Sequence, residues 1–600
     1  MDALPSSLIT KLPHKAPVDP TRIMPIPLRS TSLSIRNPLD KDHAFSSLPK
    51  KFNRSLKAYT SSSSSPAPLD ESEGLTPRPL LKILNRVEDV INTFIDPPNK
   101  PWIEPEHVLS GNFAPVAELA PTECKVIEGT LPACLEGVYI RNGPNPYLPQ
   151  QGPYHLFDGD GMLHCVRISG GRITFCSRFV RTYKLINEEE AGVAIVPNFF
   201  AAFNGVAASF ARGAVYLSRM AALHYDRSKG MGVANTSIAI IGGKLYALCE
   251  SDLPYEIRIT SDGDIETMGR HNFSGKLAGS MTAHPKIDPD TGEVFAFRNR
   301  ICPQRLSYFR IDPNGNKHHD VPILSLDRPS FLHDFAITTK YAILPNIQVG
   351  MDLSGFFTKR GPGAASDSKR VSRIAVIPRY AENNKELRWF EIPGLNMFHI
   401  ANAWEETDAS REEHIVLIAP NVSPVEHMLE GFELMDTTIE KVRINLKTGL
   451  SSRQPLCPRN LELAVINRAY QGKKCRYVYA GVVDPIPKTS GILKLDLSKV
   501  QSDQWDCTVA SRMYDPGCYG SEPFFVPKEA DKADAEEDDG YLVSYVHDEK
   551  TAESKFIVMD AKSPSLEIIA SVKLPQRVPY GFHGLFIGEK DLQALHSHKP

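Results

Sequence analysis

The sequence predicts an all-β protein of the propeller type, preceded by a basic leader and an N-terminal amphipathic helix. From about Gly111 onward, short segments rich in Val, Ile, Phe and Tyr alternate with Gly, Asn and Asp turns. Few helical intervals separate these segments, which argues against a parallel α/β sheet. The pattern continues without a break in composition, which favours a propeller over a sandwich or a barrel.

Residues 1–69 form the leader. Ten Lys and Arg residues face only four acids there, and a serine run extends from Ser61 to Ser65. A basic, serine-rich and acid-poor start is typical of an organelle transit peptide. A disordered tail without a targeting role is the alternative.

A helix is predicted over residues 76–96. Thr76-Pro77 suits its start and Asp96-Pro97-Pro98 its end. Its apolar positions follow the helical period and include Leu80, Leu84, Val87, Ile91 and Phe94. This broad face either packs on the body of the protein or lies in a membrane interface. A second apolar stretch between Val196 and Leu223 strengthens the membrane-surface interpretation.

The strand signals in residues 100–600 are clear in several places. Thr236–Ile241 and Lys244–Leu248 flank a Gly242-Gly243 turn, as in a hairpin. Similar segments begin at Val294, Tyr308, Val442, Tyr541 and Lys555.

Composition excludes several functions. The net charge of -3 gives no reason to expect nucleic acid as a partner. The ten cysteines include no Cys-x-x-Cys pair, and no phosphate-binding or dinucleotide-binding glycine motif is present, so no nucleotide cofactor is expected. No run approaches the roughly 20 apolar residues that cross a bilayer.

Four histidines stand in short, mostly apolar segments, and three glutamates stand in equally apolar settings. Neutral imidazole is a common metal ligand, and its second ring nitrogen usually needs an acceptor. A carboxylate is rarely buried without a partner. We therefore predict one metal centre, although a lone histidine in an apolar strand is more often a core residue. The predicted ligands and their partners are His284, His333, His399 and His583, with Glu250, Glu462 and Glu522.

The other histidines are left out of this set. His155, His164 and His547 occupy turn or inter-strand positions. The remainder lie in the leader or near charges, turns or the terminus, and those outside the leader, such as His414, are predicted on the surface.

A family resemblance rests on a series of ordered motifs. The chain is similar to the plant carotenoid cleavage dioxygenases from about residue 100 to the end, and most similar to their fourth subfamily. The nine-cis-epoxycarotenoid dioxygenases match less well. The motifs are Arg141-Asn-Gly-Pro-Asn-Pro146, His155-Leu-Phe-Asp-Gly-Asp-Gly-Met162, Glu250-Ser-Asp-Leu-Pro254, Thr282-Ala-His-Pro285, Phe331-Leu-His-Asp-Phe335, Asn402-Ala-Trp-Glu-Glu406, Ser521-Glu-Pro-Phe-Phe525 and Val578-Pro-Tyr-Gly-Phe-His-Gly584.

The resemblance implies a seven-bladed propeller with a helical cap over one Fe(II) on its axis. It implies that the four histidines above bind the iron and that Glu250, Glu462 and Glu522 orient three of them. It implies no catalytic residue beyond the metal centre. It implies that O2 is the cosubstrate and that a carotenoid or apocarotenoid is cleaved, most simply at the 9,10 and 9′,10′ bonds, to C13 ketones such as β-ionone. It also implies a chloroplast protein at a membrane or plastoglobule surface.

Two segments depart from the subfamily pattern. Asn460-Leu-Glu-Leu-Ala-Val465 stands where many members resemble Asn-Leu-Asp-Phe-Ala-Val, and Phe297-Arg-Asn-Arg-Ile-Cys-Pro-Gln-Arg305 is more polar than usual. The second departure leaves open 7,8 and 7′,8′ cleavage of zeaxanthin or β-carotene to crocetin dialdehyde-type products. Three further functions also stay open: nine-cis-epoxycarotenoid cleavage, a retinoid-type isomerohydrolase on the same scaffold, and a binding propeller without enzymatic activity.

Overall fold

A computed structural model describes residues 78–98, 100–200, 206–300, 305–323, 331–351, 364–429, 431–500, 505–529, 532 and 534–597. All of them belong to the second of the chain's two units, Glu71–Pro600. The predicted leader, the predicted helix start at Thr76-Pro77 and the centre of the polar segment 297–305 lie outside the described residues.

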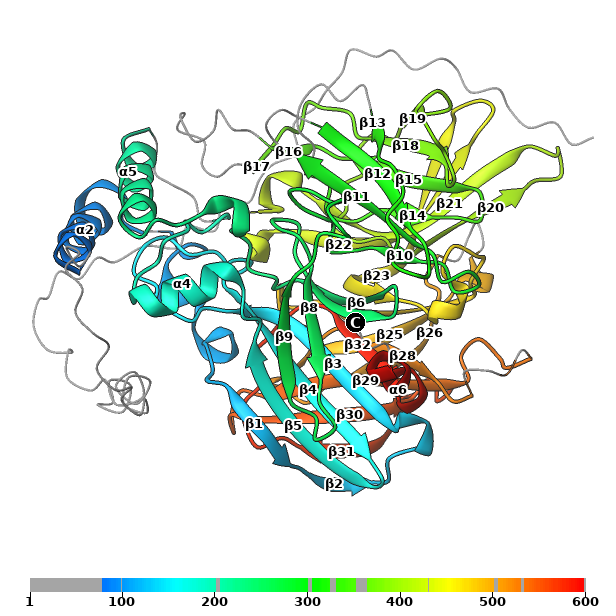
Figure 1. The fold of residues 1–600 in the computed structure, drawn as a ribbon. Helices are drawn as coiled ribbons and strands as arrows, with labels where there is room; N and C mark the ends of the chain where they lie inside the picture. Colours follow the sequence, from blue (N-terminus) through cyan, green and yellow to red (C-terminus); the bar gives the residue numbers. More distant parts are fainter. Residues whose placement is uncertain are drawn as a thin grey trace, which may run out of the picture. The chain divides into compact units, whose positions relative to one another are not determined.

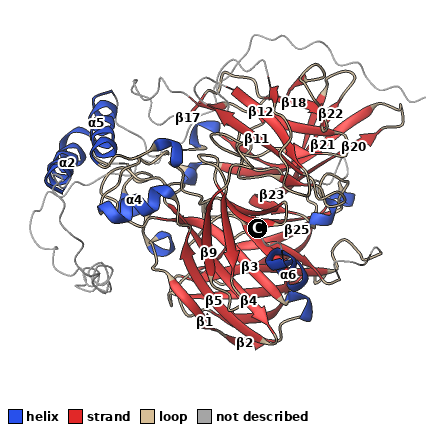
Figure 2. Ribbon diagram, in the orientation of Figure 1, coloured by secondary structure: helices blue, strands red, loops and turns tan. Residues whose placement is uncertain are grey.

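Strands make up most of the regular secondary structure of the described chain (Figure 2). The predicted N-terminal helix is present from Arg78 onward and ends in a π-helical turn. α4 and α6 were not predicted. Thr182 caps α4 by accepting a hydrogen bond from the Leu185 N–H, and Gly192 ends it with a left-handed φ of 67°. The α-helices and the π-helical turn are α2 (Arg78–Val90), η1 (Ile91–Ile95), α3 (Pro105–Val108), α4 (Tyr183–Ala191), α5 (Val206–Ala222) and α6 (Glu589–Ser597).

Two sheets combine strands from both ends of the chain, as the neighbouring blue and red strands in Figure 1 show. The first has the order β1-β5-β4-β3-β32 and consists of β1 (Leu119–Glu123), β3 (Gly137–Asn145), β4 (Asp160–Ser169), β5 (Arg172–Phe179) and β32 (Gly584–Gly588). The second has the order β2-β31-β30-β29-β27, with β28 also on β29, and consists of β2 (Lys125–Gly129), β27 (Cys518–Gly520), β28 (Phe524–Pro527), β29 (Gly540–Asp548), β30 (Glu553–Asp560) and β31 (Ile568–Lys573).

Three sheets of four strands follow the chain order. They consist of β6 (Ser237–Ile241), β7 (Lys244–Leu248), β8 (Tyr255–Ile259) and β9 (Ile265–Arg270); of β10 (Lys286–Ile287), β11 (Val294–Arg300), β12 (Arg305–Ile311) and β13 (Val321–Ile323); and of β14 (Ala336–Ile337), β15 (Tyr341–Asn346), β18 (Arg373–Pro378) and β19 (Arg388–Glu391).

The last sheet in this series has more strands. The long strand β23 pairs with β22 through its first residues and with β24 through its last, and so joins two sets of strands. It consists of β20 (Asn402–Thr407), β21 (Glu413–Ser423), β22 (Asp436–Asn445), β23 (Ser451–Val465), β24 (Tyr477–Val482), β25 (Gly491–Asp496) and β26 (Thr508–Met513). A small ribbon pairs β16 (Val349–Met351) with β17 (Ala364–Ser366).

Local sequence explains the hairpins. Gly242-Gly243 and Gly170-Gly171 all have positive φ, the backbone that two-residue hairpin turns require. They join β6 to β7 and β4 to β5, each in register up to the turn. The strands predicted on either side of Gly242-Gly243 are thereby confirmed.

Apolar side chains fill the spaces between neighbouring sheets. One core cluster joins the sheet of β3–β5 to the sheets of β6–β9 and β28–β31, and it includes Val138, Val166, Ile257, Val543 and Val572. Further clusters follow the chain from sheet to sheet. Each sheet therefore buries both faces, which accounts for the many fully apolar strands.

Helices α2 and α5 pack against each other through Leu84, Ile91 and Val215 (Figure 1). An ion pair, Arg212 Nε to Asp96 Oδ2 at 2.5 Å, is buried beside this contact, with side chains 3% and 0% exposed. The two helices and η1 also leave apolar side chains exposed, among them Phe94 of η1 at 78% and Phe210 of α5 at 62%. The predicted helix therefore packs on the protein with one face and presents another to the surroundings.

Among the described helices, none is long and apolar enough to cross a membrane.

The buried ion pair predicts how α5 is held. Replacing Arg212 with Ala removes the buried guanidinium that pairs with the Asp96 carboxylate, so the free energy of local opening of α5 should fall by about 3–5 kcal/mol. Hydrogen exchange of residues 206–222, followed by mass spectrometry, measures this. The matched control is Arg258→Ala, whose ion pair with Glu266 is about half exposed and should contribute less than about 1 kcal/mol. Equal protection of α5 in both variants would contradict the prediction.

Candidate metal centre

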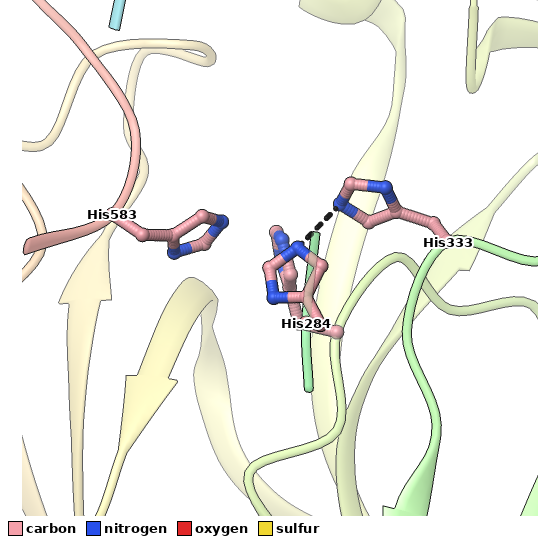
Figure 3. A group of neighbouring side chains, drawn as sticks. His284, His333 and His583 are labelled. Carbon is pink, nitrogen blue, oxygen red and sulfur yellow. Dashed lines mark hydrogen bonds between the residues drawn. The ribbon is translucent and has the colours of Figure 1, made fainter. Parts of the chain in front are cut away.

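The four predicted histidines come together at one point, and Figure 3 shows three of them, His284, His333 and His583. His284 lies two residues before β10, His333 three before β14, His399 three before β20, and His583 immediately before β32. One ring nitrogen from each lies within 4.8 Å of the others. The Nε2 atoms of His284 and His333 are 3.0 Å apart, the contact drawn as a dashed line in Figure 3.

Local burial explains why these rings share one space. Leu332, Phe398 and Ile400 flank the histidines and are at most 8% exposed. All three belong to core clusters between neighbouring sheets, so these cores fix the segments that carry His333 and His399.

The three predicted glutamates hold three of these rings from behind. His399 Nδ1 donates to Glu462 Oε2 at 2.9 Å, and His583 Nδ1 donates to Glu522 Oε1 at 2.8 Å. His333 Nδ1 lies 2.7 Å from Glu250 Oε1. Each carboxylate occupies Nδ1, which leaves Nε2 as the free ring nitrogen.

The carboxylates come from three different sheets. Glu250 lies in the turn between β7 and β8, Glu462 is in β23, and Glu522 lies between β27 and β28. Glu522 also accepts the Gly584 N–H through Oε2 at 3.0 Å. It therefore fixes both the His583 ring and the first residue of β32.

The charges of the group are tightly coupled. Burial, followed by the neighbouring imidazoles, lowers the pKa of His284 well below its usual value. Burial also opposes a charged His399, but Glu462 outweighs it and raises the pKa of that ring. Burial opposes an ionised Glu522, but His583 and its hydrogen bond outweigh it and lower the pKa of the carboxyl. The glutamate is therefore an anion, and an acceptor, at neutral pH.

Asp334 joins three of the histidine segments, and the sequence analysis missed it. Its Oδ2 accepts the Ile400 N–H at 2.8 Å, and its Oδ1 lies 2.7 Å from Lys286 Nζ. The side chain is 3% exposed. The signal was available, because Asp334 stands in the apolar Phe331-Leu-His-Asp-Phe335 stretch just as the three glutamates stand in theirs.

Two histidines outside the cluster have ordinary partners. The Nε2 of buried His155 contacts the Leu429 carbonyl at 3.0 Å. His414 is 6% exposed, so its predicted surface position is wrong; its Nε2 meets Asp408 Oδ2 at 2.9 Å. Asp408 also accepts backbone N–H groups of the hairpin between β20 and β21, so its contact with His414 is part of the structure of this turn.

A cavity of about 1180 Å³ leads to the histidine cluster, and three of the four histidines line it. Tyr216, Leu217 and Met220 of α5 line one part of it, and His333, His399 and His583 line another. A series of aromatic ring contacts runs along its wall from Phe199 through Phe200, Phe157 and Phe398 to His333, with centroids 4.9–6.3 Å apart.

The donor set suits a divalent transition metal. The Nε2 atom of His399 is buried and has no hydrogen-bond partner among the described residues, and such an atom normally needs one. Four neutral imidazoles match Fe, Zn, Cu or Ni, and they leave octahedral positions open for small molecules. The residues present therefore fit a metal ion.

Comparison with known proteins shows the family to which the chain belongs. The profile of the RPE65 family (Retinal pigment epithelial membrane protein) matches residues 113–588. The chain belongs to this family, that of RPE65 and the carotenoid oxygenases. Among its members, the chain is an enzyme of the carotenoid cleavage dioxygenase class.

Two curated relatives and one solved structure are similar to this chain. "Probable carotenoid cleavage dioxygenase 4, chloroplastic" from Arabidopsis thaliana is 56% identical over 516 residues, covering 86% of each chain. "Zeaxanthin 7,8(7',8')-cleavage dioxygenase, chromoplastic" from Crocus sativus is 49% identical over 377 residues, covering 62% of this chain and 99% of the relative. A crystal structure of a Synechocystis apocarotenoid oxygenase variant has a TM-score of 0.67 at 26% identity, covering 82% of this chain and all of that one.

The geometry predicts one divalent ion per chain. Titration of the metal-free protein with Co²⁺, followed by visible absorption, should saturate at one equivalent. His333→Ala should abolish this absorption, because it removes a ring of the cluster. Glu522→Gln should weaken affinity about 10–100-fold, because the amide holds His583 less firmly.

The control is His547→Gln, whose imidazole bonds to Ser554 and lies outside the cluster. It should bind Co²⁺ like the unaltered protein. Unchanged Co²⁺ binding in His333→Ala would exclude the cluster as the site.

Proposed function

We propose that this protein is a plastid, Fe(II)-dependent dioxygenase that cleaves a conjugated double bond of a carotenoid or apocarotenoid. One observation carries the proposal: four imidazoles, three of them backed by carboxylates, stand beside an aromatic-lined cavity in a chain of this family. Dioxygen adds across one C=C bond, and one oxygen atom ends in each of two carbonyl products.

His284, His333, His399 and His583 would hold the iron, which supplies binding and activation of O2. Bound through Nε2, the four rings would be neutral ligands, so the ion would keep its full positive charge. Glu250, Glu462 and Glu522 orient the rings through Nδ1 and keep Nε2 deprotonated and available. The proposed reaction needs no proton transfer by any other side chain.

The aromatic wall would receive the polyene. The rings of Phe157, Phe200 and Phe398 offer flat apolar surface to a flat apolar chain, and such contacts exclude water from the reacting bond. No polar group needs to recognise the middle of a hydrocarbon. The position of the cut therefore depends on where the cavity wall stops the substrate.

We propose the 9,10 and 9′,10′ bonds as the site of cleavage, with a C13 ketone such as β-ionone as one product. The likeness to the fourth plant subfamily supports this choice, as does a 40% identity over 504 residues to "Carotenoid 9,10(9',10')-cleavage dioxygenase 1" from Arabidopsis thaliana. The Crocus relative, named for cleavage of zeaxanthin at 7,8 and 7′,8′, favours a cut one double bond away instead.

We propose a propeller of seven blades. The sheets of the described residues support this number when the long sheet is divided within β23, between Pro455 and Asn460, where its pairing with β22 shifts register, and when the β16–β17 ribbon is set aside. Helices α4 and α5 would belong to the cap, because residues of both line the cavity.

We further propose that residues 1–69 are a plastid transit peptide and that the mature protein works at a membrane or plastoglobule surface. The 56% identical Arabidopsis relative is named as chloroplastic. Exposed apolar side chains of α2 and α5 adjoin the cavity-lining part of α5, so a lipid-dissolved substrate could enter without crossing water.

Product analysis tests the reaction. Iron-loaded protein, incubated in air with detergent-dispersed β-carotene or zeaxanthin, should release a C13 ketone with its C27 or C14 partner, resolved by chromatography and mass spectrometry. Anaerobic incubation and His333→Ala should each abolish the products. A C10 aldehyde instead would establish 7,8 cleavage. Products that form without oxygen would favour the isomerohydrolase and rule out the dioxygenase.

Membrane association has a separate test. The double variant Phe94→Asp, Phe210→Asp places charge on the exposed face of α2 and α5. Sedimentation with galactolipid vesicles should fall at least tenfold, because each buried Phe contributes about 1.5–3 kcal/mol. Leu450→Asp is the control, since Leu450 is 73% exposed at the turn between β22 and β23. Equal loss in both variants would exclude a specific lipid face.

A further inference from the structure

β23 contains a bulge beside the metal centre. Leu461 pairs with Val482 and Glu462 with Gly481, but the next pair is Val465 with Tyr479. β23 therefore uses one residue more than β24 over this stretch. Bulges of this kind commonly sit next to active sites, where they redirect a side chain.

Leu463 is the residue that makes the bulge, and its backbone is strained. Its φ is +55°, in the left-handed region, which in such bulges is normally occupied by glycine. A leucine held there has a conformation that the surrounding structure must enforce. A glycine would adopt the same backbone without strain, so the leucine side chain requires an explanation.

Part of the backbone geometry serves Glu462. The Leu463 N–H donates to Glu462 Oε2 at 2.5 Å, and the same oxygen accepts from His399 Nδ1 at 2.9 Å. The left-handed turn thus aims a peptide N–H at the carboxylate that holds a candidate ligand. Glycine would provide this hydrogen bond equally well, so it does not account for the side chain.

The side chain faces a different environment from its neighbours. Within the described residues, Leu461, Ala464 and Val465 belong to or pack against the hydrophobic cores, whereas Leu463 is in none of them. Leu463 is half-buried and lines the cavity, as do Glu462 and Val483. Its apolar atoms therefore form cavity wall beside the metal centre, not core.

We propose that Leu463 is a specificity-determining residue, which selects the double bond that lies at the metal by limiting the room for a methyl branch there. This inference rests on the proposed function. In β-carotene and zeaxanthin, the 9,10 bond carries a methyl group on C9, and the 7,8 bond carries none. A wall residue at this place discriminates between the two bonds by volume alone.

The test is a volume series at position 463. The ratio of C13 ketone to C10 aldehyde, measured by mass spectrometry from β-carotene and from zeaxanthin, should follow the order Leu463→Gly above the unaltered protein above Leu463→Phe. We expect about tenfold between neighbouring members, the discrimination that one or two methylene-sized contacts supply. Leu463→Met, of similar volume, should keep the original ratio.

Two further readouts separate specificity from structural effects. Iron content should stay at one per chain throughout the series, and the melting temperature of Leu463→Gly should equal or exceed that of the unaltered protein. The matched control is Ala552→Gly, which relieves a left-handed φ of 57° at an exposed turn. It should leave the product ratio unchanged.

The outcomes are distinct. If the unaltered protein gives no oxygen-dependent product, the proposed function fails, and this inference with it. If it cleaves carotenoids but the ratio is constant across the series, only the role of Leu463 is overturned. A constant ratio with iron loss in Leu463→Gly would assign the residue to the support of Glu462 instead.

Discussion

The pairing of three carboxylates, two of them buried, with three imidazoles is the constraint on which the rest of the structure depends. Neither group is stable in an apolar interior without the other, since an isolated buried carboxylate costs several kcal/mol. Glu250, Glu462 and Glu522 come from three separate sheets. Glu250 and Glu522 each meet a histidine that precedes a strand of another sheet, and Glu462 meets His399, which precedes the first strand of its own long sheet. The contacts form only when those sheets surround one point.

Both ends of the chain must also meet for the centre to be complete. His583 directly precedes β32, and β32 pairs with β3 near the start of the described chain, from Gly137 opposite Gly588 to Arg141 opposite Gly584. The Asn142 N–H then donates to the His583 carbonyl at 3.0 Å. A candidate ligand about 440 residues away from this strand is thus placed by ordinary sheet hydrogen bonds. The long separation explains why no local motif announces the cluster.

Helices α2 and α5 are held by few contacts, and α5 contributes to the cavity wall. α2 and α5 are joined by a small apolar contact and by a buried ion pair, which gives orientation more than energy. The cavity begins where α5 lines it and ends at histidines that the sheets hold. A mobile or lipid-bound entrance is therefore compatible with a rigid centre. Leu463 lies at the rigid end, where a strained backbone can be maintained.

Much of this protein is determined locally and could be predicted from its sequence. Gly-Gly pairs require hairpins, the period of Leu80 to Phe94 requires a helix, and histidines and glutamates in apolar segments require one another. Such rules depend on near neighbours or on residue type alone. They identify the seven site residues without a geometry for them.

Only the tertiary structure decided which histidine meets which glutamate, that Asp334 joins three segments, and that His414 is buried. It also decided the backbone of Leu463, because a bulge is a mismatch between two strands and neither strand shows it alone. These features arise from contacts between residues far apart in the chain, whose energies depend on distance and direction. Sequence specifies which groups need partners; packing selects the partners.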